Sequence, residues 1–270
     1  MIDSHAHLQS VAFARDLPEV LQRARAAGID ALLVPGWNRD SSRAAVDMAG
    51  TREGIDLLAA VAIHPHNAAE ADEAAWADVS ALADEGPVAA IGETGLDYDR
   101  MRSPRDAQLV NLRRHLQLAL RLGKPLVLHC RSAAGRRDAH DELLAQLEAA
   151  GVGGQAWAAR FAGRPPAVLH SFSGPPDYAE AALRLGLAVS FSGLVFRAGE
   201  EASADVARSV PPDRLLVETD CPFLAPPGGP KRNEPAFVRR TAEWLAEQRG
   251  VELAALERDL AANFRRTFGS

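Results

Sequence analysis

Six histidine, glutamate and aspartate residues stand at or near the ends of short apolar runs, where they could hold metal ions and activate water. Imidazole and carboxylate groups are common ligands of divalent transition metals, and a pair of such ions can promote hydrolysis. Parallel strands carry functional residues at their carboxyl ends, so we expect one shared two-metal site. The candidate ligands are His5, His7, Glu93, His129, His170 and Asp220.

The first three candidates have spacings that suit a metal centre. Side chains alternate along a strand, so His5 and His7 would face the same side and reach one ion. A surface pair of histidines would have the same spacing, but the position at the end of the first apolar run favours ligands. Glu93 follows Gly92, which would leave space beside a ligand, and its two carboxylate oxygens can bridge two metals. A buried ion pair with an arginine is the alternative for Glu93.

The other three candidates follow later apolar runs. His129 and His170 close two successive runs, where a single histidine would more often be a core residue bonded to backbone. By alternation Glu218 and Asp220 face the same way, with Asp220 nearer the rim as a metal ligand and proton acceptor. A helix N-cap is the alternative for Asp220, but Pro222 argues against an ordinary helix after it.

Eight short apolar runs alternate with helical patterns along the chain. Runs that are apolar on both faces are typical of strands covered on both sides, and helical spacing of leucines and alanines marks segments such as Pro18–Ala27 and Ala107–Leu122. We therefore predict a closed (β/α)₈ TIM barrel, with a doubly wound open sheet as the alternative. The predicted strands are Met1–Ser4, Ala31–Val34, Leu57–Ile63, Val88–Ile91, Leu126–Leu128, Ala167–Leu169, Leu187–Phe191 and Leu215–Val217.

The composition excludes several classes of protein. A formal net charge of −6 gives no broad basic surface, and two cysteines in 270 residues form no disulfide framework. No apolar run approaches the roughly 20 residues of a membrane span, and we expect no signal peptide before the first strand. We expect a single domain over residues 1–270, cytoplasmic, monomeric and with no membrane partner.

Seven motifs distributed over nearly the whole chain resemble the TatD family of metal-dependent hydrolases, and they occur in that family's order. The resemblance implies a TIM barrel of the amidohydrolase type and deoxyribonuclease activity, often as a 3′→5′ exonuclease. The motifs are Asp3-Ser-His-Ala-His-Leu, Ile63-His-Pro-His, Ile91-Gly-Glu-Thr-Gly-Leu-Asp-Tyr, His129-Cys-Arg, His170-Ser-Phe-Ser-Gly, Glu218-Thr-Asp-Cys-Pro-Phe-Leu-Ala-Pro and Lys231-Arg-Asn-Glu-Pro.

The resemblance also implies how the ligands divide between two divalent ions, which could be magnesium, manganese or zinc. His5, His7 and Asp220 resemble the ligands of one ion, His129 and His170 those of the second, and Glu93 the bridge. The two ions would activate a water for attack on a phosphodiester, and Asp220 would accept its proton. The expected partner is DNA, single-stranded or at its ends.

The chain departs from the family pattern after His129. Residues are inserted before Arg137, so either Arg131 or Arg137 occupies the family's arginine position. The interval to His170 is also longer than is usual in the family, and the surplus lies at about 151–166. We expect this insertion to be a longer surface loop.

Loops at the carboxyl ends of the predicted strands supply candidate substrate contacts. Solvated surface charge is the alternative for each basic residue, and hydrogen bonds within the loop are the alternative for His64 and His66. A hydrolase of C–N or carboxylic ester bonds using the same centre is the alternative function, and a non-catalytic scaffold is a third. The candidate substrate contacts are His64, His66, Arg131, Arg137, Lys231 and Arg232, with Arg136 and Arg197 as further phosphate contacts.

Overall fold

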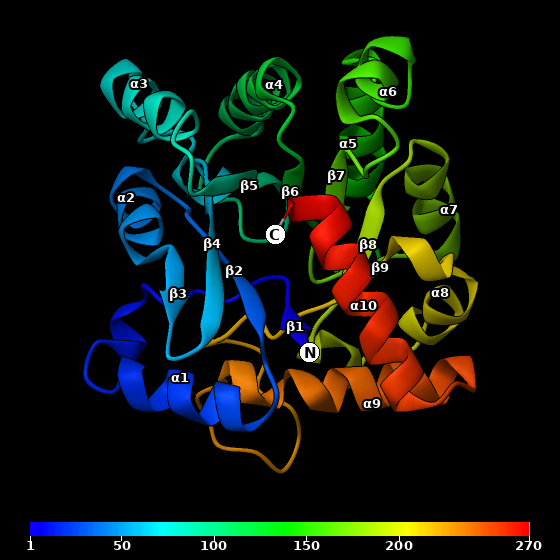
Figure 1. Cartoon of the computed structure of the whole chain (residues 1–270). Helices are drawn as coiled ribbons and strands as arrows, with labels where there is room; N and C mark the ends of the chain where they lie inside the picture. The colour runs from blue at the N-terminus through cyan, green and yellow to red at the C-terminus, as the bar shows by residue number, and fades with distance from the viewer. Residues whose placement is uncertain (270) are drawn as a thin grey trace.

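The computed structural model describes residues 1–269 and shows eight parallel strands arranged as a barrel, with helices outside them (Figure 1). Each strand pairs with the next barrel strand along the chain, as expected for repeated strand–helix–strand units. The barrel strands are β1 (Ile2–Asp3), β2 (Ala31–Pro35), β4 (Ile55–Val61), β5 (Val88–Asp97), β6 (Leu126–Arg131), β7 (Ala167–Leu169), β8 (Ala188–Phe191) and β9 (Leu215–Val217).

Hydrogen bonds between the first and last strands join the two edges of the sheet. The Ser4 amide donates to the Val217 carbonyl at 3.0 Å, and the His7 amide donates to the Cys221 carbonyl at 2.8 Å. A parallel bridge also pairs Ala6 with Cys221. The predicted barrel is therefore confirmed over the open sheet.

The helices lie outside the barrel and bury their apolar faces against it. Helix α4, for example, buries Leu112, Leu116 and Ala119, and it ends at Gly123 in the left-handed conformation with φ 68°. The predicted helices Pro18–Ala27 and Ala107–Leu122 correspond to α1 and α4 within two residues. The α-helices are α1 (Leu17–Ala26), α2 (Arg39–Met48), α3 (Glu73–Leu82), α4 (Arg105–Leu122), α5 (Asp138–Ala149), α6 (Gln155–Phe161), α7 (Pro176–Arg184), α8 (Ser203–Ser209), α9 (Val238–Arg249) and α10 (Leu253–Phe268). Short 3₁₀ helices are η1 (Val11–Phe13), η2 (Pro65–Asn67), η3 (Gly193–Phe196), η4 (Pro212–Arg214) and η5 (Pro235–Phe237).

The insertion predicted as a loop at about 151–166 contains helix α6, so that prediction was wrong. Trp157 and Phe161 are buried, and their rings stack with centroids 5.4 Å apart. The Trp157 indole nitrogen donates to the Ala150 carbonyl at 2.9 Å. Two aromatic side chains one helical turn apart bury enough apolar surface to order a short helix that sequence pattern alone does not reveal.

Strand β5 is longer than predicted and contains an irregularity that re-aims its side chains. Ile91 pairs with Leu126, but Thr94 pairs with Leu128, so β5 holds an extra residue between these two points. This bulge surrounds Gly92 and Glu93 and turns Glu93 toward the barrel end. A short additional strand, β3 (Gly50–Arg52), pairs antiparallel with the first residues of β4.

Two glycines let β5 approach β6 closely. A Cβ on Gly92 would lie 2.5 Å from the Val127 Cβ, and one on Gly95 would lie 1.9 Å from the His129 carbonyl oxygen. Gly95 also has φ 139°, which side chains disfavour. The space beside Gly92 is thus filled by β6, which corrects the expectation that it leaves room for a ligand.

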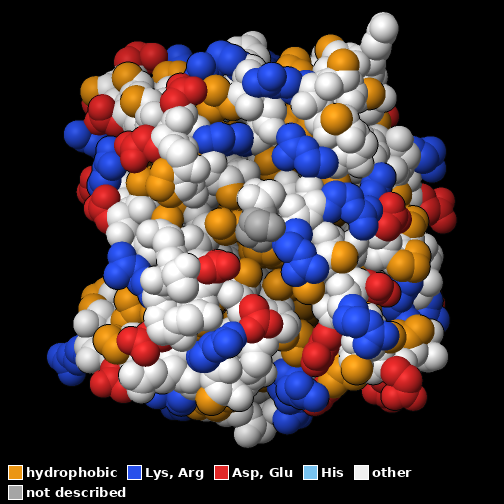
Figure 2. Space-filling view, viewed as in Figure 1, with side chains coloured by type: hydrophobic (Ala, Val, Ile, Leu, Met, Phe, Trp, Pro, Cys, Tyr) orange, Lys and Arg blue, Asp and Glu red, His pale blue; other side chains and the backbone are white. Residues whose placement is uncertain are grey.

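Helix α10 covers the end of the barrel where the strands begin and crosses in front of the barrel in Figure 1. The Asn263 side chain donates to the carbonyls of Pro212 and Leu215 at 2.6 and 2.9 Å, at the start of β9. On the face shown in Figure 2, basic and acidic side chains are interspersed. None of the described helices is both long and apolar enough to cross a membrane.

Replacing Gly95 by alanine should destabilise the protein strongly, because the new methyl group would collide with the β6 backbone. We expect a loss of about 2–3 kcal/mol in the free energy of unfolding, measured by urea denaturation. Gly86→Ala is the matched control, since Gly86 has no heavy atom within 4 Å of an added Cβ. Equal stability of the two variants would contradict the close approach of β5 and β6.

Candidate metal centre

The six candidate ligands converge at the carboxyl end of the barrel, and Glu93 lies between them. Its Oε2 atom is 3.4 Å from His5 Nε2 and 3.6 Å from His7 Nε2. The two imidazole nitrogens are 3.1 Å from each other. Asp220 Oδ1 lies 3.4 Å from His7 Nε2 and 3.7 Å from His5 Nε2. These four side chains therefore direct their ligand atoms at one small region.

The other oxygen of Glu93 faces a second group of nitrogens. Glu93 Oε1 lies 2.9 Å from His170 Nε2 and 3.1 Å from His129 Nδ1. His170 Nε2 and His129 Nδ1 are 3.5 Å apart. Glu93 thus presents one oxygen to each half of the site, which is the arrangement that a bridging carboxylate needs.

His64 lies closer to this centre than its expected role as a substrate contact requires. Its Nε2 atom is 3.1 Å from Glu93 Oε1, and the side chain is buried. His64, Glu93 and His129 form one of the groups with ligand atoms close enough to hold a metal. The sequence placed His64 only on a loop after a strand and gave no distance to Glu93.

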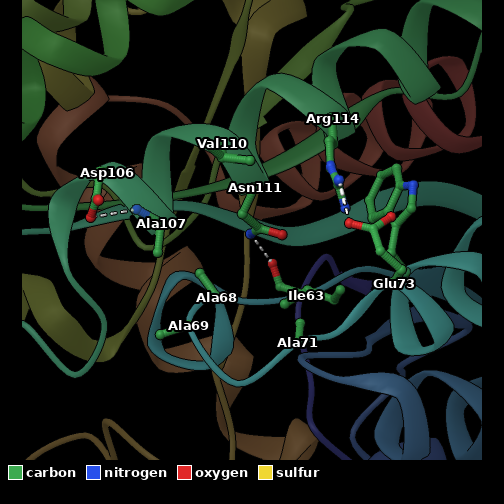
Figure 3. A pocket seen from close by; sticks show the side chains of 11 residues that line it. Ile63, Ala68, Ala69, Ala71, Glu73, Asp106, Ala107, Val110, Asn111 and Arg114 are labelled. Atoms are coloured by element: carbon green, nitrogen blue, oxygen red, sulfur yellow. Dashed lines mark hydrogen bonds and ion pairs between the residues drawn. The ribbon is translucent and has the colours of Figure 1, made fainter.

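Helix α4 fixes the loop that carries His64. The Asn111 side chain donates to the Ile63 carbonyl at 2.7 Å, as Figure 3 shows, and His115 Nε2 accepts from the Ile63 amide at 3.1 Å. His115 Nδ1 lies 2.8 Å from the Asn111 carbonyl, which completes the support. Both polar groups of Ile63 are therefore satisfied inside the protein, and His64 follows directly from this fixed residue.

Carboxylates behind the histidines set which ring nitrogen faces the site. Glu218 Oε1 lies 3.0 Å from His170 Nδ1 and also accepts from the Ser171 amide at 2.6 Å. Asp97 Oδ2 lies 3.2 Å from His129 Nε2 and 2.7 Å from His66 Nε2. A histidine that donates one nitrogen to a carboxylate keeps the other available for a metal. His66 is thus hydrogen-bonded to Asp97, next to the Nε2 atom of His129, whereas the Nδ1 atom of His129 faces Glu93.

The electrostatics favour ionised carboxylates inside the barrel. Burial alone would raise the pKa of Glu93, but the imidazoles of His64, His170 and His129 outweigh it and hold that pKa well below its usual range. Burial also opposes ionisation of Asp220, but the neighbouring histidines outweigh this effect and lower its pKa. Burial would lower the pKa values of His7, His129 and His170, but the nearby carboxylates outweigh it and raise them. A metal must displace protons from these three imidazoles, so metal binding weakens as pH falls.

A cavity of about 1270 Å³ opens directly above these residues. Its lining includes the carboxylates and imidazoles of the centre, the rings of Trp37 and Phe223, the acidic residues Glu70, Asp99 and Glu200, and basic side chains from the end of β6 and from two loops. Those basic residues are Arg100, Arg102, Arg131 and Arg136. Of the arginines predicted as phosphate contacts, Arg131 and Arg136 therefore line the cavity, and sequence reasoning missed Arg100 and Arg102.

Four predicted substrate contacts are not among the residues that line the cavity. Arg232 pairs with Asp16 at 2.6 Å and with Glu234 at 2.8 Å. The Arg137 side chain pairs with acidic residues of α5 and α7, and Arg197 donates to the Ala225 carbonyl. Arg232 and Arg137 are thus held in local ion pairs, and Lys231 also lies outside the lining, so a role of these residues in substrate binding stays a prediction.

The family model for TatD related DNase matches residues 2–269. The chain belongs to the TatD family. A relative from Erwinia billingiae, named 3′-5′ ssDNA/RNA exonuclease TatD, is 38% identical over 275 residues, covering 99% of this chain and 98% of that protein. A Bacillus subtilis relative, named uncharacterized metal-dependent hydrolase YabD, is 33% identical over 272 residues, covering 99% and 98%.

Two solved structures have the same fold as this chain. The TatD homologue YJJV from Escherichia coli K12 superposes with a TM-score of 0.84 at 26% identity, covering 100% of this TatD-family chain and 98% of that one. A TatD family hydrolase from Entamoeba histolytica gives a TM-score of 0.85 at 21% identity, with coverage of 100% and 98%. At that lower identity the second comparison supports the fold alone.

Glu218→Gln should weaken metal binding, because a neutral amide replaces the carboxylate that accepts the Nδ1 proton of His170. That hydrogen bond directs the Nε2 atom toward the site. We expect about 10–100-fold lower affinity for manganese or zinc by isothermal titration calorimetry. Glu180→Gln, at an exposed position on α7, is the control. Unchanged affinity in Glu218→Gln would contradict an orienting role for this carboxylate.

Proposed function

We propose that this protein is a metal-dependent nuclease that removes nucleotides from the 3′ end of single-stranded DNA. The observation that carries the proposal is Glu93, whose two oxygens face two separate groups of imidazole nitrogens. Membership of the TatD family supports it, as does the exonuclease name of the Erwinia relative, which this chain matches over nearly its full length.

The donor set fits two divalent ions, magnesium, manganese or zinc. His5, His7 and Asp220 would hold one ion, His129 and His170 the other, with Glu93 between them. The fit rests on the close approach of inward-facing imidazole nitrogens and carboxylate oxygens. The other ring nitrogens of His170, His129 and His7 lie against Glu218, Asp97 and the Pro35 carbonyl, respectively. Such ions lower the pKa of water and offset negative charge on a phosphoryl group.

The chain's own groups supply the proton chemistry. Asp220 is half-buried at the rim, has a lowered pKa, and presents Oδ1 beside His7. An ionised carboxylate in that position can orient the attacking water and accept its proton as the new oxygen–phosphorus bond forms. The bond from phosphorus to the leaving sugar oxygen then breaks, and that oxygen takes up a proton. The Asp220 amide donates to the His5 carbonyl at 2.9 Å, which fixes the backbone of this general base against β1.

The lining of the cavity favours a phosphodiester over a C–N or carboxylic ester substrate. Arg100, Arg102, Arg131 and Arg136 lie at the cavity, where guanidinium groups suit phosphate. A hydrolase of neutral carbonyl compounds would need an apolar pocket instead. A scaffold protein would have no need of six ionisable groups held in one buried centre. The cytoplasmic location and the monomeric state stay predictions.

Removing either acidic group should abolish hydrolysis while leaving the fold intact. We expect Glu93→Gln and Asp220→Asn each to lower kcat by at least about 100-fold, with circular dichroism and melting temperature near those of the wild type. Glu180→Gln serves as the control. Wild-type turnover by purified Asp220→Asn would remove this residue from the assigned role.

A panel of substrates tests the reaction itself. We expect chelator-treated protein to be inactive, and added magnesium, manganese or zinc to restore release of mononucleotides from 3′-labelled single-stranded DNA. Blunt duplex DNA, RNA and a generic phosphodiester are measured beside it. Hydrolysis confined to a lactone or an amide would contradict the nuclease assignment and favour the alternative.

A further inference from the structure

An exposed aromatic side chain stands at the edge of the metal centre. Phe223 is 59% exposed and lines the cavity, with its ring centroid 6.1 Å from that of His7. A single exposed apolar side chain is ordinary on a protein surface, but an aromatic ring that lines a cavity beside polar groups is in a position to contact a ligand. Among residues 1–269, Phe223 is the single aromatic residue in the group of exposed large hydrophobic side chains.

The backbone beneath Phe223 is held firmly although its ring is exposed. The Phe223 amide donates to the Asp220 carbonyl at 3.0 Å, and the Asn233 amide donates to the Pro222 carbonyl at 3.1 Å. A Cβ on Gly193 would lie 2.0 Å from the Leu224 carbonyl oxygen, so η3 packs directly on this turn. A ring on a fixed backbone loses little conformational freedom when it binds a ligand.

A second aromatic side chain lies on the same side of the centre. The Trp37 ring is half-buried, lines the cavity and has its centroid 5.2 Å from that of His7. The Trp37 backbone amide donates to Ser41 Oγ at 2.8 Å, which anchors it to the start of α2. The half of the site that contains His5, His7 and Asp220 is therefore flanked by two aromatic rings.

The opposite half of the site is flanked by cations. Arg100 and Arg102 are exposed, line the cavity, and form no ion pair with any residue of the described chain 1–269. The Arg100 amide donates to Asp97 Oδ1 at 2.7 Å, and the other oxygen of Asp97 contacts His129. The loop that carries both arginines is thus fixed beside the second group of imidazoles.

The neighbouring arginines differ in having acidic partners. Arg131 pairs with Asp99 at 2.8 Å, and Arg136 pairs with Asp138 at 3.0 Å. Their charge is partly offset within the protein, whereas that of Arg100 and Arg102 remains available to a ligand. Cationic side chains alone suit any polyanion, whereas aromatic rings that line the same cavity add a preference for ligands that carry planar groups.

Building on the proposed function, we propose that Phe223 and Trp37 form the base-binding subsite, and Arg100 and Arg102 the phosphate-binding subsite, of a single nucleic-acid strand. The base beside the scissile phosphate stacks on Phe223, and the phosphates that follow lie along the Arg100–Arg102 loop. A base still paired in a duplex cannot place its face on Phe223, so the geometry selects an unpaired end. Stacking on an aromatic ring does not discriminate between bases, and the arginines bind phosphates independently of the sequence.

The two subsites give different signatures in a binding experiment. Full-length, manganese-loaded protein is titrated into a fluorescent, cleavage-resistant phosphorothioate oligonucleotide at several salt concentrations, with anisotropy as the readout. We expect Phe223→Ala to weaken binding roughly tenfold with an unchanged salt slope. Arg100→Ala with Arg102→Ala should lower the slope of log affinity against log salt by about 0.7 for each phosphate that the protein no longer neutralises.

Matched controls separate stacking and charge from general damage. Phe223→Tyr keeps the ring and should bind as the wild type, and Arg184→Ala removes an exposed cation on α7 outside the cavity. An oligonucleotide with abasic sites should bind Phe223→Ala and wild-type protein equally. Wild-type affinity of Phe223→Ala for the base-containing strand, or an unchanged salt slope in the double arginine variant, would overturn the proposal.

A cleavage assay on the same variants separates this proposal from the nuclease assignment. If the wild type binds with these signatures but cleaves no nucleic acid under any metal, the subsites stand and the nuclease activity is wrong. If it cleaves single-stranded DNA while Phe223→Ala binds and cleaves equally well, the nuclease stands and the subsites are wrong. Failure of the wild type to bind any oligonucleotide would overturn both.

Discussion

The shared carboxylate of Glu93 is the constraint on which the site depends. One side chain must present one oxygen to the imidazoles that follow β1, and the other oxygen to His129 in β6 and His170 just after β7. A regular strand would not aim it there, and the bulge in β5 does so. The glycines on either side then allow β5 to stay against β6. The bulge in β5 and its two glycines, which look unrelated in the sequence, therefore both serve to place the two oxygens of Glu93.

The surroundings of this carboxylate are asymmetric. The half nearest Phe223 and Trp37 is bounded by aromatic rings, and the half nearest Asp97 is bounded by cations and by carboxylates that bind ring nitrogens. Acidic groups outside the ligand set matter as much as the ligands, because they decide which nitrogen faces inward. A net-acidic protein can in this way hold a polyanion, since positive charge is needed only where phosphates lie.

Much of the architecture follows from local pattern, and the exceptions have physical reasons. Strand ends and helical spacing sufficed for the eight barrel strands and for the convergence of His5, His129 and Asp220, because those patterns reflect burial on both faces. Pattern could not reveal the bulge at Glu93, since it arises from pairing with β6. It also did not reveal helix α6, which is stabilised by the burial of two aromatic rings. The ion pair between Arg232 and Asp16 could not be predicted either, because it joins segments far apart in the sequence.

The closure of the barrel by β1 and β9 has a consequence for how the activity arises during synthesis. His5 leaves the ribosome more than 200 residues before Asp220 does, yet their backbones bond directly. A nascent or truncated chain lacking β9 has neither a closed ring nor a complete ligand set. The ligand set is therefore complete only after β9 and Asp220 have been made, so the site assembles late in synthesis.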